Sequence, residues 1–381
     1  MSRPTTPVGT ALLPAGAPPA RAKPLRRLYE LDALRIAAAV AVMVYHYTFS
    51  GPAGGLTSLS FPGLSQVTRY GYLGVDAFFM ISGFVVLLSA WDRTPRQFLT
   101  SRAVRLYPAY WAAVTLTAVV CVVLGAGRFS VSGAQYLANL TLFNAPLGVA
   151  NVDVVYWTLW AELRFYLVVL ALVLIGLSRR RVTAALWVWL GAAVLIETGL
   201  LPTTAGRVLE VLVQAQWAHY FIAGMALCLM YKYGPDRSVL ALVLAAFGNA
   251  LYQGLAFART VGARYDQAFS PVVIASVITV IFLVLAGIAL GRTHRLGRPW
   301  FAKIGALTYP LYLLHAYIGF ILLNQFHHKV DPYVLLAAVI TTMIASAYAL
   351  HRWIETPLAR VLRRLLASGT GPRTATTGRS T

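Results

Sequence analysis

Residues 31–50 have the sequence LDALRIAAAVAVMVYHYTFS, an apolar run that nevertheless contains Arg35 and His46. A run of about 20 mostly apolar residues is long enough to cross a bilayer as a helix. Nine similar runs follow it along the chain. The ten predicted helices cover approximately residues 32–50, 72–91, 104–126, 154–178, 182–201, 208–231, 238–258, 270–290, 301–323 and 333–352. The sequence therefore predicts an all-α, polytopic membrane protein with about ten transmembrane helices.

The composition supports a membrane protein over a nucleic-acid-binding one. Of the 381 residues, 59% are hydrophobic and 12% are charged, far from the average of soluble domains. The net charge is +20, but Lys and Arg occur in short clusters between apolar runs and do not gather on one folded face. Cys121 and Cys228 lie inside apolar runs, so no disulfide framework is expected.

The distribution of positive charge predicts the orientation of the helices. Most Lys and Arg residues fall in the two tails and in the loops at 92–103, 179–181, 232–237 and 291–303. Positively charged loops remain in the cytoplasm, and an even number of helices puts both ends on one side. We therefore expect cytoplasmic termini and a multi-pass protein of the inner (plasma) membrane.

The chain divides into a transmembrane domain and two tails. Residues 1–27 are predicted to be a disordered cytoplasmic tail, 28–360 the transmembrane domain, and 361–381 a basic cytoplasmic tail. In the first segment the basic cluster follows the apolar stretch, which is the wrong order for a cleaved signal peptide.

Charged residues inside a membrane are costly and are functional candidates by default. Arg35 is expected near the inner end of the first helix, and His46 lies eleven residues, or roughly 16 Å, further out. By depth, Asp76, Glu162 and His315 fall in the same outer half as His46. Depth does not establish contact between them.

A cationic mouth is expected on the inner side. Arg102 and Arg105 are three residues apart and project from one helical face. With Arg35 they form a group suited to phosphate binding. Positive-inside anchoring is the structural alternative for any one loop arginine.

The other candidates also have structural alternatives. His46 and His315 could hydrogen-bond between helices, and Asp76 could fix a helix end. Glu162 could pair with Arg164, although two residues apart is a poor helical spacing. The position of Ser82 beside Gly83 favours a close helix-packing contact over a nucleophile.

These residues lie in six strings that follow one another along the chain. The strings are LDALRIAAAVAVMVYHY (31–47), GYLGVDAFFMISGF (71–84), SRAVRLYPAYW (101–111), WTLWAELRFY (157–166), LTYPLYLLH (307–315) and HRWIETP (351–357). In content and order they resemble the motifs of the acyltransferase 3 family of integral-membrane O-acyltransferases. Members often carry an acidic residue soon after the first-helix histidine, and residues 47–68 contain none. The partner of His46 is therefore left open between Glu162 and Asp76.

The resemblance implies that an acyl group, expected to be acetyl, moves from cytoplasmic acyl-CoA to a hydroxyl. We hypothesise that Arg35, Arg102 and Arg105 hold the donor phosphates and that His46 deprotonates the acceptor or carries the acyl group. A carboxylate of Glu162 or Asp76 would orient the imidazole. Further candidates are Ser82, Trp157, Tyr166 and His315. No bound cofactor, metal or nucleic acid is expected.

The acceptor is not determined by the sequence. A carbohydrate or a glycosylated or secreted metabolite is expected, and a macrolide or other antibiotic is an alternative within the same family. A transporter of a small solute or acyl group would also bury charged residues, but paired halves with broken helices are not visible.

Overall fold

The computed structural model describes residues 27–368, apart from a few side chains. Within these residues the secondary structure consists of helices, with no strand. This confirms the predicted all-α class.

The long helices are joined by short helical turns. In chain order the elements are α1 (Tyr29–Tyr45), η1 (His46–Ser50), α2 (Gly51–Ala53), α3 (Pro62–Thr68), η2 (Arg69–Leu73), α4 (Gly74–Ala90), α5 (Pro95–Leu124), α6 (Gly133–Leu140), η3 (Val154–Tyr156), α7 (Trp157–Leu174), α8 (Arg179–Glu197), α9 (Thr203–Val213), α10 (Ala215–Tyr233), α11 (Arg237–Tyr265), α12 (Pro271–Ala289), α13 (Phe301–Phe326), α14 (Pro332–Leu350), η4 (His351–Glu355) and α15 (Thr356–Ser368).

Nine helical stretches in the described part of the chain are long and apolar enough to cross a membrane. The chain is therefore a multi-pass membrane protein. The predicted run at 182–201 forms α8, which is not among the nine. Three arginines, Arg179 to Arg181, occupy the first turn of α8, and they lower its apolar character.

Two differences from the predicted helices move or divide a helix near candidate residues. Helix α5 begins at Pro95, nine residues before the predicted start, because Thr94 and Gln97 form a reciprocal capping box. The predicted helix at 208–231 is divided at Gln214, whose φ of 44° is left-handed. The arginines expected at the start of the third helix, Arg102 and Arg105, therefore lie well inside it.

The predicted tails fall largely outside the described residues. Residues 1–26 and 369–381 are not described. Residues 361–368, assigned to the C-terminal tail, continue helix α15.

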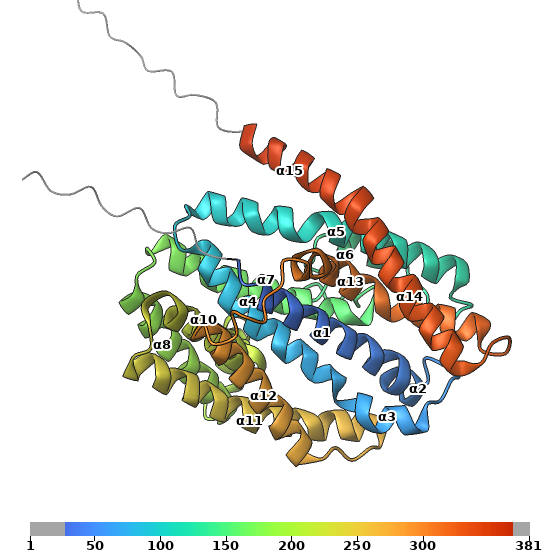
Figure 1. Ribbon diagram of the computed structural model, residues 1–381, viewed down its shortest axis with the longest axis horizontal. Helices are drawn as coiled ribbons and strands as arrows, with labels where there is room; N and C mark the ends of the chain where they lie inside the picture. The colour runs from blue at the N-terminus through green and yellow to red at the C-terminus, as the bar shows by residue number, and fades with distance from the viewer. Residues whose placement is uncertain (1–26, 369–381) are drawn as a thin grey trace, which may run out of the picture.

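The helices form two groups around a central pair. Figure 1 shows α1 and α4 in the middle, with α8, α10, α11 and α12 together on one side. Helices α5, α13, α14 and α15 lie on the other side (Figure 1). Each group has its own cluster of buried apolar side chains. The space between the clusters is where a cavity opens.

Helices α4 and α10 approach each other very closely. A Cβ at Gly83 would lie 2.3 Å from the carbonyl oxygen of Phe221, and one at Gly224 would lie 2.0 Å from that of Met80. Glycine at both positions lets the backbones pack together, as in other membrane helix pairs. The helical face of α4 that carries Gly83 is thus fixed against α10, while Ser82 faces elsewhere.

Two π-helical turns interrupt the long helices. They are η1, which begins at His46, and η4, which ends at Glu355. Such turns are rare and occur frequently at functional sites.

Candidate active site

A cavity of about 1200 Å³ lies between the two helix groups. Its walls come from α1, α4, α5, α7, α13 and α15. Along α4 it extends from Val86 to Val75, eleven residues or roughly 16 Å of helix. Arginines lie at the Val86 end, and Phe78, Thr158 and Tyr312 line the other end.

The three arginines predicted from the sequence all line this cavity. Arg35 lies 3.5 Å from Asp32, and Arg105 lies 3.7 Å from Glu355. The guanidinium of Arg102 lies over the Tyr166 ring at 5.7 Å and donates to Ser89 Oγ at 3.2 Å. All three arginines thus border the same cavity, and phosphate binding stays a prediction.

Glu162 lies in the cavity wall together with two hydroxyl groups. The Ser82 hydroxyl donates to Glu162 Oε1 at 3.1 Å, and the Tyr166 hydroxyl donates to the same oxygen. The alternative pairing with Arg164 is not formed, because Arg164 donates to the Glu210 carbonyl and lies over Trp160. Glu162 thus accepts hydrogen bonds from two hydroxyl groups that line the same cavity.

His46 and His315 form a pair. Their ring centroids are 5.2 Å apart, and His315 is completely buried. His315 Nδ1 lies 2.8 Å from the Tyr312 carbonyl oxygen, which can only accept, so this nitrogen carries the proton of the neutral ring. His315 Nε2 then presents a lone pair, and it has no hydrogen-bond partner within the described residues. His46 Nδ1 lies 3.2 Å from Ser50 Oγ.

The histidine pair lies just beyond the closed end of the cavity and is not part of its lining. Tyr312 lines the cavity, and its ring centroid is 5.6 Å from that of His315. The Tyr312 hydroxyl is held by Thr158 Oγ1 at 3.0 Å. Tyr312 thus borders both the cavity and the His315 ring.

Neither expected carboxylate contacts His46 among the described residues. Glu162 is engaged with Ser82 and Tyr166, as above. Asp76 accepts a hydrogen bond from Tyr220 of α10 at 2.9 Å and does not line the cavity. Depth along a helix does not determine which helical face a residue occupies, and Asp76 points toward α10.

Trp157 also lies away from the lumen. Its ring packs 5.3 Å from that of Trp217 and 6.2 Å from that of Phe79. Trp157 joins α7 to α10 and does not line the cavity.

The structure also reveals residues that the sequence did not single out. Asp153 is fully buried just before η3 and accepts backbone hydrogen bonds from Val155 and from Tyr317 of α13. Burial raises the pKa of Asp153 from 3.8 to about 7, although both hydrogen bonds oppose the shift. The sequence feature that could have drawn attention to Asp153 is its position at the end of a loop, directly before an apolar run.

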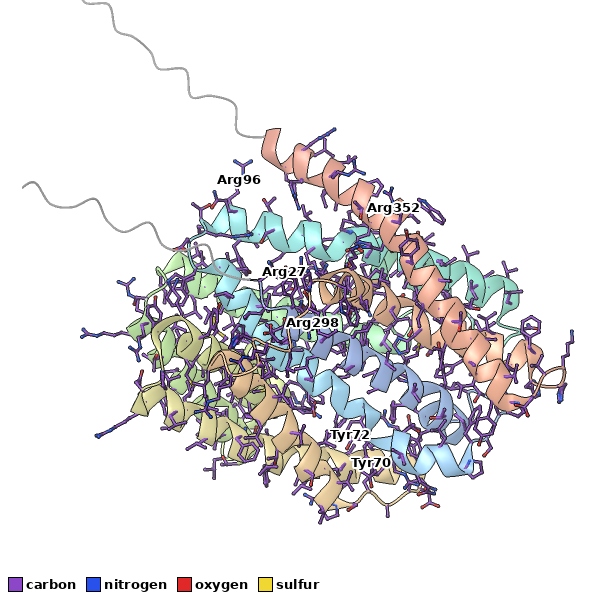
Figure 2. The ribbon with its side chains drawn as sticks, in the orientation of Figure 1. Arg27, Tyr70, Tyr72, Arg96, Arg298 and Arg352 are labelled. Atoms are coloured by element: carbon purple, nitrogen blue, oxygen red, sulfur yellow. The ribbon has the colours of Figure 1, made fainter. Side chains whose placement is uncertain are left out.

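Further arginines surround the cavity mouth. They are Arg93, which lies just before α5, Arg96 in the first turn of α5, and Arg363 of α15. Figure 2 shows Arg96 at the start of α5, on the opposite side of the view from Tyr70 and Tyr72, which precede α4. In the sequence these arginines look like ordinary positive-inside residues, so the pattern gave no reason to choose them.

Comparison with known proteins agrees with this architecture. A family model described as "Acyltransferase domain" matches residues 28–352. The peptidoglycan O-acetyltransferase OatA of Listeria monocytogenes is 26% identical over 167 residues, which cover 39% of this chain and 24% of that protein. This chain thus matches only about a quarter of the relative's length. No solved structure matches. Because the family model covers most of the chain, including every cavity helix except α15, the chain belongs to the acyltransferase 3 family of membrane O-acyltransferases.

Proposed function

We propose that the protein transfers an acyl group, expected to be acetyl, from acyl-CoA to a hydroxyl of a carbohydrate or of a glycosylated or secreted metabolite. The observation that carries the proposal is a single cavity with arginines at one end and the pair of His46 and the buried His315 near the other. This arrangement suits a long donor that carries phosphates at one end and a thioester at the other.

The arginine end suits the phosphates of the donor. Seven arginines and three carboxylates line the cavity, a formal excess of four positive charges. Arginine binds phosphate oxygens through two parallel hydrogen bonds, and these bonds strengthen where water is excluded. Because the loops at this end are the positively charged ones, we place the mouth on the cytoplasmic side of the plasma membrane.

The histidine pair suits general base catalysis. In the proposed reaction an imidazole of the pair, with His46 as our candidate, removes the proton of the acceptor hydroxyl. The hydroxyl oxygen attacks the thioester carbonyl carbon, the C–S bond breaks, and the thiolate of CoA takes the proton from the imidazolium. Transient acylation of His46, followed by attack of the hydroxyl, is the second route.

Tyr312 must move aside, or the thioester must pass it, for the donor to reach His46. A rotation of one side chain about χ1 is a small change compared with a helix movement. The part of His46 that remains exposed is not in the donor cavity, so the acceptor could approach from the other side.

Glu162 is proposed to act inside the cavity, not as a direct partner of His46. Its carboxylate lies in a lumen whose excess charge is positive and accepts from Ser82 and Tyr166. We expect it to orient these two hydroxyls toward the thioester arm of the donor.

The acceptor proposal rests on the family and on one relative. The name of the Listeria protein states that it O-acetylates peptidoglycan, a glycan with free hydroxyls. The matched segment covers only part of that protein, so a glycan hydroxyl is proposed here as a chemical class.

The proposal is tested by incubating purified, reconstituted protein with acetyl-CoA labelled in the acetyl group. We expect slow release of free CoA with water as acceptor, and labelled ester when a soluble glycan fragment is added. Mass spectrometry of cell-surface glycans and secreted metabolites, with and without the gene, then identifies the acceptor. A reconstituted protein that binds no acyl-CoA, yet moves a solute across the bilayer, would be a transporter.

The arginine assignment has its own test. Arg102→Gln and Arg105→Gln should weaken acetyl-CoA binding by about tenfold each, because a charge-assisted hydrogen bond contributes about 1.5–3 kcal/mol. Acceptor binding should change little. The matched control is Arg180→Gln on α8, an exposed arginine outside the cavity. Equal weakening of donor and acceptor would contradict the assignment.

A further inference from the structure

The mouth of the cavity carries a second set of arginines, separate from the first. Arg93, Arg96 and Arg363, here called the outer arginines, are exposed and line the cavity. Arg35, Arg102 and Arg105 are called the inner arginines. Arg102 and Arg105 lie further along α5 than Arg96, and Arg35 and Arg102 are partly buried, whereas Arg105 is exposed. On α5 the step from Arg96 to Arg102 is six residues, which is roughly 9 Å of helix.

The two sets differ in how their charge is balanced. Arg35 pairs with Asp32, which also pairs with Arg27, the remaining arginine of the lining, and Arg105 pairs with Glu355. Glu162 is the third carboxylate of the lining. It accepts a hydrogen bond from Tyr166, and the guanidinium of Arg102 lies over the Tyr166 ring. All twelve acidic residues of the chain fall within the described range, and none forms an ion pair with an outer arginine. The uncompensated positive charge of the cavity is therefore concentrated at its mouth.

Helix α15 is held in place over this mouth. Arg96 Nη2 donates to the Leu366 carbonyl oxygen at 3.2 Å, which joins the start of α5 to the end of α15. Arg363 lines the cavity from α15, whereas its neighbour Arg364 does not. The outer arginines thus come from two segments that lie about 270 residues apart in the sequence. The hydrogen bond between Arg96 and Leu366 joins these two segments.

A CoA thioester carries phosphate at two places: a diphosphate between pantetheine and ribose, and a monophosphate on the ribose 3′ oxygen. When the thioester points toward Phe78 and Tyr312, the diphosphate is the anionic group nearer the closed end. The 3′-phosphate then remains nearer the entrance. Two arginine sets at two depths match this order of charges.

We propose that Arg93, Arg96 and Arg363 form a subsite for the ribose 3′-phosphate of the acyl-CoA donor. This inference rests on the proposed function, because it assumes that the donor is acyl-CoA. It adds a selection step: the protein distinguishes acyl-CoA from its 3′-dephospho form and from other acyl thioesters at the cavity mouth.

The test measures binding of acetyl-CoA and of 3′-dephospho-acetyl-CoA to the full-length, purified protein in neutral nanodiscs. The wild-type protein should bind the dephospho form at least about tenfold more weakly, since the lost phosphate removes charge-assisted hydrogen bonds. Arg363→Gln and Arg96→Gln should weaken acetyl-CoA binding and leave binding of the dephospho form unchanged, so the preference shrinks. Arg102→Gln should weaken binding of both donors and keep the preference.

The matched control is Arg364→Gln, which makes the same charge change on the next residue of α15, outside the cavity. It should keep both affinities. A wild-type protein that binds both donors equally would overturn the subsite while leaving the proposed acyl transfer in place. So would an Arg363→Gln variant that retains the wild-type preference. Absence of binding to either donor would overturn the proposed function itself, and the subsite with it.

Discussion

At the scale of single residues, the contact between Asp76 and Tyr220 gives the first prediction. Tyr220→Phe leaves the buried Asp76 carboxyl without its partner and should lower the free energy of unfolding by about 1–3 kcal/mol. Asp76→Asn retains an acceptor for Tyr220 and should cost less. Because Asp76 lies outside the cavity, acyl transfer per folded molecule should persist in both variants. Transfer abolished in Asp76→Asn with unchanged thermal unfolding would restore a catalytic role for Asp76.

The raised pKa of Asp153 predicts how the stability of the folded protein depends on pH. Its pKa is about 7 in the folded protein and 3.8 in an exposed chain, so the folded state holds this proton more tightly. Its contribution is therefore fully present below about pH 4 and is lost as the pH rises to about 7. Asp153→Asn should flatten that part of the thermal-stability profile in detergent. The exposed Asp266→Asn is the control, and an unchanged profile in Asp153→Asn would rule out this explanation.

The residues of the cavity could be predicted only in part. Arg35, Arg102, Arg105, Ser82, Glu162 and Tyr166 carried clear signals, because each is polar within an apolar run and lies in a family-like string. The contact of His46 with His315 could not be predicted, since depth along a helix leaves its rotation unknown. The outer arginines were hidden among the many loop arginines that serve membrane orientation.

At the scale of helices, the close approach of α4 and α10 makes a sharp prediction. Gly83→Ala places a methyl group 2.3 Å from the Phe221 carbonyl oxygen, in backbone that cannot yield without moving a helix. We expect a strong loss of folded protein, measured by size-exclusion chromatography and thermal unfolding. Gly248→Ala in α11 is the control, because its Cβ would meet nothing within 4 Å and alanine favours a helix. Equal behaviour of the two variants would contradict the close packing.

The helices themselves were largely predictable from the length of apolar runs. The start of α5 was missed because Arg96, Gln97 and Arg102 interrupt the apolar pattern, although the capping box around Thr94 was present in the sequence. The break at Gln214 had no comparable signal. A left-handed glutamine between two helical stretches depends on tertiary contacts that the sequence alone does not display.

At the scale of the whole molecule, the topology depends on α8. Cytoplasmic placement of both termini requires an even number of crossings, and nine stretches in the described chain meet the criteria without α8. We therefore predict that α8 crosses the membrane, with Arg179–Arg181 at its cytoplasmic end. Reporter fusions after residue 368 and at the N-terminus should both give the cytoplasmic signal. Opposite signals would mean that α8 does not cross.

The most direct test of the central claim separates donor binding from chemistry. His46→Ala protein should fold and bind acetyl-CoA within about twofold of the wild-type affinity, because the cavity lining does not include His46. Its rate of acyl transfer should fall by about 10²–10⁴, the usual contribution of a general base. Acetyl-CoA binding and acyl transfer should be measured on the same reconstituted sample, so that a loss of transfer is not mistaken for a loss of binding. A folded His46→Ala variant that transfers the acyl group at the wild-type rate would contradict the account.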